Sequence, residues 1–172
     1  GLELKQDMME LVQNLQSEIP GAFDDEDYEK QKASIVEAYR KQESDHFAKL
    51  AEEARKEDLG LQRTPQGIVV VPLLEGKLMT PEEYNALSEK ERNKIDGHRQ
   101  KMESRFQEIG RTMVRSGKDI KQKLDELDAA ITGCVVKPHL DELRDKYPTN
   151  SDVTEYLNAV EAYISGHAED FQ

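Results

Sequence analysis

Apolar residues recur every three or four positions near the start of the chain. The positions with this spacing are Leu4, Met8, Leu11 and Leu15. The spacing predicts an amphipathic helix. We expect this helix to end at Ile19-Pro20-Gly21, because a proline disfavours helical geometry in the residue before it.

A second helix is expected from the acidic run 24–27, since negative charge favours a helix N-terminus. Its apolar stripe comprises Tyr28, Ile35, Tyr39, Phe47, Leu50 and Ala54. We expect it to stop near Leu59-Gly60, where glycine suits the residue that follows a helix.

The middle of the chain changes to strand-like patterning. Two β-type runs, 61–64 and 68–73, flank Thr64-Pro65-Gln66-Gly67, which has the composition of a type I turn. The pattern predicts a β-hairpin over residues 61–74, with Pro72 at an edge or a bulge. A two-stranded hairpin is marginal in water, so this one must pack on helices or on a neighbouring domain.

Helical patterning then resumes and continues to the C-terminus. Thr80-Pro81-Glu82-Glu83 and Ser88-Glu89-Lys90-Glu91 each form a capping box, the second of which opens a helix over roughly 88–147. We expect an irregularity near Gly117, where the apolar spacing slips, and a kink at Pro138. The apolar stripe of the long helix includes Met102, Phe106, Ile109, Met113, Ile120, Leu124, Leu127, Ile131 and Cys134.

A last helix is expected to open at Asp152, with Glu155 in its first turn. The side chains that we expect it to bury are Val153, Tyr156, Leu157, Val160 and Ile164. The elements together predict a mainly α fold: a long antiparallel helical hairpin or coiled coil, with a small β-hairpin insertion and a C-terminal helix. We expect residues 1–172 to form a single helical domain, in which the β-hairpin occupies residues 61–74.

Composition supports long helices that each bury one stripe. Hydrophobic residues make up 36 % of the chain, charged residues 35 %, and there is no tryptophan, which is too polar for a compact multilayer core. The formal net charge of −12 repels phosphate, so we expect neither nucleic acid nor an anionic membrane as a partner. One cysteine, Cys134, and no long apolar run suit a reducing, cytoplasmic location.

No catalytic arrangement emerges from the sequence. Gly76-Lys77 and Gly117-Lys118 both lack the upstream glycine and the following Ser or Thr of a phosphate-binding loop. Glu43-x-x-His46 has the spacing of one half of a di-iron site, but the required second copy is missing. We therefore expect no cofactor and no metal in this chain.

Several motifs together resemble one known family. They are Pro20-x-x-Phe23 with Tyr28, the run 59–73 with its Thr-Pro-x-Gly turn, Gly76-Lys77, Thr80-Pro81-Glu82-Glu83-Tyr84, Leu127-Asp128, Leu143-x-x-x-Tyr147 and Tyr156-Leu157. This order is similar to the helical insertion within the ATPase module of Lon-related bacterial proteases. The resemblance covers nearly the whole chain.

The resemblance implies that the chain is a fragment of a larger AAA+ protease, which uses a serine–lysine dyad and forms a homohexamer. ATP and magnesium would serve that parent protein, and the partners of this fragment would be the remaining ATPase and protease domains of the same chain. The insertion would project near the substrate entrance, where it would gate or capture unfolded protein substrates without catalysis of its own.

Two other classes of protein stay open on the sequence. One is a free-standing coiled-coil adaptor or scaffold, and the other is a helical-bundle metalloenzyme. Candidate contacts to substrate or partner are Ile68, Val69, Val70 and Val71, because successive apolar residues make both faces of the hairpin apolar. The alternative is that helices bury both faces and that the hairpin is a structural corner.

Overall fold

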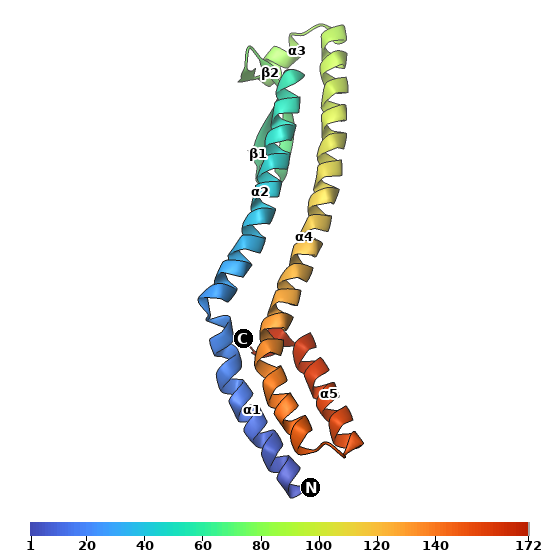
Figure 1. Cartoon of the computed structure of the whole chain (residues 1–172). Helices are drawn as coiled ribbons and strands as arrows, with labels where there is room; N and C mark the ends of the chain where they lie inside the picture. Colours follow the sequence, from blue (N-terminus) through green and yellow to red (C-terminus); the bar gives the residue numbers. More distant parts are fainter. Residues whose placement is uncertain (172) are drawn as a thin grey trace. The chain divides into compact units, whose positions relative to one another are not determined.

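A computed structural model describes residues 1–171. The chain divides into two compact units, each described by itself: the bundle unit, residues 1–37 and 119–172, and the sheet unit, residues 38–118. Two long helices contribute to both units (Figure 1). The elements in chain order are α1 (Leu2–Phe23), α2 (Glu26–Lys56), β1 (Leu59–Thr64), β2 (Gly67–Leu74), β3 (Lys77–Leu78), α3 (Pro81–Asn85), α4 (Glu89–Lys146), α5 (Ser151–Gly166) and the 3₁₀-helix η1 (Ala168–Phe171).

These elements confirm the mainly α fold, with its long helix, small antiparallel sheet and C-terminal helix. Pairing between the long helices is antiparallel within the sheet unit, where Glu53 of α2 contacts Arg105 of α4 and Tyr39 lies opposite Gly117. The helix α4 is continuous from Glu89 to Lys146, through both Gly117 and Pro138.

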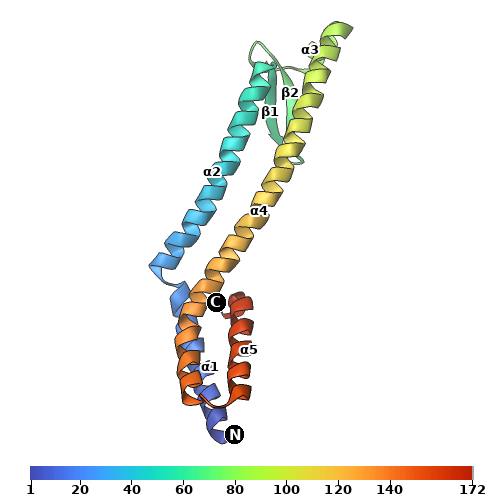
Figure 2. The ribbon, with the colours of Figure 1, turned by 45° about the vertical axis from the view of Figure 1, so that its right-hand side comes forward.

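Three helices run side by side in the bundle unit: α1, the second half of α4, and α5 (Figures 1 and 2). Their apolar stripes, together with Tyr28 at the start of α2, form one core. Its buried members are Leu11, Leu15, Ile19, Phe23, Tyr28, Val136, Leu140, Val153, Leu157 and Ile164. The stripe predicted for α1 is therefore confirmed at Leu11 and Leu15.

The predicted end of the first helix at Pro20 is wrong. Helix α1 continues to Phe23, with Pro20 inside it. The proline removes one backbone donor, but Ile19 and Phe23 on either side of it are both buried. Burial of two large side chains outweighs a single missing hydrogen bond in the last turn. The Asp24 amide then closes the helix by donating to the Pro20 carbonyl.

The phase predicted for the second half of α4 is wrong at Cys134, which is exposed. The side chains that face the core are instead Thr132, Val136 and Leu140, each no more than 1 % exposed. An α-helix drifts relative to a strict seven-residue repeat, so a stripe extrapolated over many turns loses its phase. Tyr156 of α5, which we expected to be buried, is also 53 % exposed.

Two predicted helix ends lie a few residues away from their true positions. The N-cap of α5 is Asn150, whose side chain accepts from the Val153 amide, and not Asp152. After α2, the left-handed residue is Asp58, with φ of 54°, and Gly60 lies within β1. Aspartate tolerates this conformation better than most residues, which is why the glycine was not needed there.

Both predicted capping boxes are confirmed. The Thr80 hydroxyl accepts from the Glu83 amide while the Glu83 carboxylate accepts from the Thr80 amide. Ser88 and Glu91 make the same reciprocal pair at the start of α4. These hydrogen bonds also lower the pKa of the Glu91 carboxyl, since they favour its charged form.

The sheet unit packs three antiparallel strands, in the order β1-β2-β3, against α2 and α4. The sheet lies behind α2 in Figure 1 and between α2 and α4 in Figure 2. Its buried contacts with the helices are made by Leu50, Ala54, Leu59, Val70 and Met102. The predicted hairpin is confirmed, with Thr64 paired to Gly67 across Pro65 and Gln66.

The sequence did not predict β3, which follows β2 through a two-residue turn at Glu75 and Gly76. Both turn residues have positive φ, 51° and 78°, the geometry of a type I′ turn, which favours Asn-Gly. Glutamate is strained at the first of these positions.

We expect Glu75→Asn to raise the free energy of unfolding by about 0.5–1 kcal/mol, measured by guanidinium titration. Glu82→Asn, outside the turn, should give no such gain.

Candidate functional site

The inner face of the sheet rests on helices. Alternate residues of a strand point to opposite faces, and Val70 and Pro72 of β2 are buried. Val70 packs in the same cluster as Leu50 of α2 and Met102 of α4. The guanidinium of Arg63, paired with Ile68 across the hairpin, lies 5.1 Å from the ring centre of Phe47 in α2. This side of the sheet is therefore occupied by the chain's own helices.

The opposite side, here called the outer face, is apolar and partly exposed. Its residues are Gly60, Gln62, Val69, Val71, Leu73 and Leu78. Val69 is 42 % exposed and Leu78 is 47 % exposed, while Val71 and Leu73 are half-buried. None of these side chains carries a charge.

Gly60 has a specific packing role on the outer face. A Cβ atom at this position would lie 2.9 Å from Leu73 Cδ2 and 3.3 Å from Leu78 Cδ2. The two leucines thus fold over the glycine backbone, where a larger residue would have to displace them. Their side chains extend the surface of Val69 and Val71 into one continuous apolar strip.

One edge of β2 is open beside this strip. The Leu73 amide donates to the Asp58 carbonyl at 2.7 Å, and the Pro72 carbonyl accepts from the Met79 amide at 2.9 Å. Because bonded positions alternate along an antiparallel pair, the backbone groups of Ile68 and Val70 point away from β1. Among the described residues, β3 pairs only with Leu73 and Leu74, so no strand covers the Ile68–Val70 edge.

The four residues predicted as contacts are thus divided between the two faces. Val69 and Val71 belong to the outer face, whereas Val70 is buried and Ile68 is half-buried on the inner side. Sequence analysis did not include Leu73 and Leu78 in the site. The sequence feature that could have indicated them is Gly76, because glycine permits the turn that brings β3 back beside β2.

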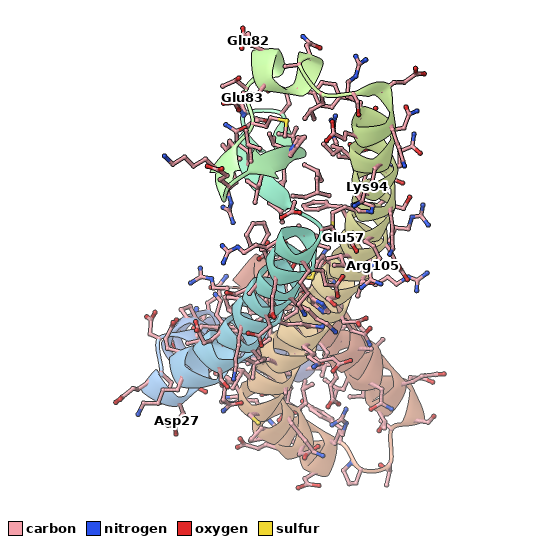
Figure 3. The ribbon with its side chains drawn as sticks, turned by 90° about the horizontal axis from the view of Figure 1, so that it is seen from above. Asp27, Glu57, Glu82, Glu83, Lys94 and Arg105 are labelled. Atoms are coloured by element: carbon pink, nitrogen blue, oxygen red, sulfur yellow. The ribbon has the colours of Figure 1, made fainter. Side chains whose placement is uncertain are left out.

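Ionic contacts tie α4 to its neighbours around the sheet. Arg105 donates to both carboxylate oxygens of Glu53, at 3.0 and 2.8 Å, and His98 lies 3.0 Å from Glu57 (Figure 3, where Arg105 and Glu57 are labelled). The Tyr84 hydroxyl, just after β3, donates to Asp96 at 2.8 Å, and this bond raises the pKa of the tyrosine. These contacts hold the sheet's supporting helices in one arrangement.

Charge is distributed unevenly between the units. The sheet unit has 16 lysines and arginines against 14 aspartates and glutamates, a formal charge of +2. The bundle unit has 8 against 22, a formal charge of −14. The expected repulsion of phosphate therefore applies to the bundle unit and not to the surroundings of the outer face.

The bundle unit contains a polar hollow at α1 and α4. Asp7 accepts hydrogen bonds from the Tyr147 hydroxyl and, at 2.9 Å, from the Lys146 ammonium. These bonds, that from Tyr147 first, lower the pKa of Asp7. His139 contacts Glu18 at 2.8 Å. Among residues 1–171, no group of three or more histidine, cysteine, aspartate or glutamate side chains is placed to hold a metal ion.

The bundle unit also has an apolar hollow of about 650 Å³ at α1 and α5. Its apolar lining comes from Leu4, Met8, Met9, Val12 and Tyr156. Met9, Val12 and Tyr156 are each about half exposed, at 58 %, 48 % and 53 %. This is a second surface on which another polypeptide could bury apolar area.

No protein-family model, curated protein or solved structure matches the chain. Within the described part of the chain, every helix is too short or too polar to cross a lipid bilayer.

Proposed function

We propose that this chain is a non-catalytic helical module of a Lon-related ATP-dependent serine protease, and that it captures unfolded protein substrates on the outer face of its sheet. The observation that carries the proposal is the uncharged apolar strip formed by Val69, Val71, Leu73 and Leu78, which the chain's own helices leave partly exposed. The motif resemblance supplies the family, the cytoplasmic homohexamer and the use of ATP and magnesium by the parent.

The chemistry of the outer face suits an unfolded polypeptide. Such a chain presents apolar side chains and unpaired backbone groups in any order, so its receptor needs apolar area more than a specific arrangement of charges. The strip supplies that area, and the Ile68–Val70 edge supplies backbone partners for an added strand. The inner face is already packed on α2 and α4, so little ordering of the sheet is needed on binding.

The apolar hollow at α1 and α5 has a different role in this proposal. We assign it to contact with the remaining ATPase and protease domains of the same chain, because Met8 and Met9 offer a flexible apolar surface that adapts to a partner. In this proposal the hollow at α1 and α5 attaches the chain to its other domains, and the outer face of the sheet binds the substrate.

The test is the double substitution Val69→Thr/Val71→Thr, which keeps side-chain volume and strand propensity. We expect it to weaken binding of a reduced and carboxymethylated protein, which cannot refold, by about tenfold, the equivalent of about 1.4 kcal/mol of lost apolar burial. Binding is measured by fluorescence anisotropy. The free energy of unfolding should change little at Val69, which is 42 % exposed, and more at the half-buried Val71, so guanidinium unfolding of the double variant verifies that it remains folded.

The matched control is Val12→Thr in the apolar hollow, where the valine is 48 % exposed. It should leave binding of the unfolded protein intact. If Val12→Thr weakens binding and the double substitution does not, the outer face is not the capture surface. In the full-length protease, the double substitution should slow degradation of an unfolded protein while cleavage of a short peptide continues.

A further inference from the structure

Helix α4 carries a second exposed surface, here called the basic face, made of Arg111, Val114, Arg115 and Lys118. All four side chains are exposed, and Val114, the apolar residue among three cations, is 63 % exposed. At 100° per residue the four lie within a sector of about 100°, roughly opposite Met102 and Ile109, which pack in the core of the sheet unit. Tyr39 of α2 lies 3.7 Å from the position of a Cβ atom at Gly117. The basic face therefore points away from the core of the sheet unit.

The cations of this face form no salt bridge with the residues that the structure describes. Among residues 1–171, none of Arg111, Arg115 and Lys118 forms an ion pair. Arg111 and Arg115 are four residues apart, and Arg115 and Lys118 three apart, so each pair repels along the helix. Glu108 and Asp119 lie three residues before Arg111 and four residues after Arg115, but no salt bridge within residues 1–171 joins them to these cations, which stay free to pair with carboxylates of a partner.

We propose that the basic face binds the acidic bundle unit of a second copy of this chain. Charge complementarity identifies the occupant: the bundle unit carries a formal charge of −14 and includes the exposed run Asp24, Asp25, Glu26 and Asp27. The exposed valine at one edge of the basic face favours a protein surface over a phosphate chain, which would bury no apolar group there. This inference does not rest on the proposed protease function.

The contact joins two different surfaces, so it is heterologous and propagates from copy to copy, closing a ring where the rotation allows. Exposed ion pairs contribute little binding energy because water and salt screen them, so the contact is weak between free copies. Covalent cross-linking therefore detects the contact even where few copies are joined at one time.

The experiment is carbodiimide cross-linking, which joins a lysine directly to a carboxylate, on a mixture of ordinary and ¹⁵N-labelled chains. We expect mixed-label cross-links between Lys118 and the run 24–27, and we expect high salt to abolish them because it screens exposed charges. Finding only single-label, intramolecular products would overturn the proposal.

Charge reversal makes the test specific. Arg111→Glu/Arg115→Glu should lose the mixed-label cross-links, as should Asp24→Lys/Asp27→Lys, and mixing the two variants should restore them. The control Lys94→Glu/Lys101→Glu changes two other exposed lysines of α4 and should keep them. Circular dichroism verifies the fold of each variant. Cross-links that survive Arg111→Glu/Arg115→Glu, or that a short RNA displaces by binding the basic face, would refute the assignment.

Discussion

Leu140→Ala should lower the free energy of unfolding of the chain by about 2–5 kcal/mol. Leu140 is fully buried, and it packs in the bundle-unit core with residues from α1, α2 and α5. Removing its side chain leaves a cavity that these elements cannot all close, since each is fixed by its other contacts. The loss is measured by guanidinium unfolding followed by far-UV circular dichroism.

Leu127→Ala is the matched comparison, because it makes the same chemical change on the same helix. Leu127 is only half-buried and lies at the margin of the core, so solvent and neighbouring side chains fill the space more easily. We expect its effect to be clearly smaller than that of Leu140→Ala. Equal effects would mean that the core of the bundle unit is not centred on Leu140.

Features set by neighbouring residues were predictable from the sequence. Both capping boxes depend on side chains three residues apart, and the hairpin turn depends on Pro65 and Gly67, so local chemistry determines each of them. The end of α1 was not predictable in this way. The contribution of Phe23 to the core depends on residues such as Val136 of α4 and Leu157 of α5, which lie more than a hundred residues away in the chain.

The phase of α4 required tertiary information for the same reason. Its apolar positions fit more than one face over so long a helix, and only packing against α1 and α5 selects Thr132 and Val136 over Cys134. Among residues 1–171 the buried Thr132 hydroxyl has no hydrogen-bond partner, and sequence patterning does not predict an unpaired hydroxyl at a buried position.

The candidate site was predicted in part. An apolar run from Ile68 to Val71 indicated a surface, but alternation alone does not say which face the helices cover. The packing of Val70 beside Leu50 and Met102 decides that question, and it leaves Val69 outside. Leu78 joins the surface only because the left-handed Glu75 and Gly76 turn the chain back, and a glutamate gives no sequence signal for that conformation.

Tyr28→Phe should destabilise the chain by about 1.5–3 kcal/mol at neutral pH. The Tyr28 hydroxyl donates to Asp128 at 2.6 Å, and its ring packs edge-on against Phe23 with 5.0 Å between ring centres. Phenylalanine keeps the ring contact but removes a hydrogen bond to a carboxylate, which is worth more than one between neutral groups.

The pH dependence separates this hydrogen bond from simple packing. Burial, followed by the bond to Asp128, raises the pKa of Tyr28 above its ordinary value, which is about 10 in an unfolded chain. A raised pKa contributes stability below about pH 10, and that stability is lost as the pH rises beyond 10, because the unfolded state releases the proton first. We therefore expect the difference in unfolding free energy between wild type and Tyr28→Phe to be constant from neutral pH to about pH 9 and to shrink above pH 10. Comparing the two proteins at each pH cancels the titration of the other tyrosines. A difference near zero at every pH would show that Tyr28 stabilises the core through its ring alone and that the hydrogen bond to Asp128 contributes nothing.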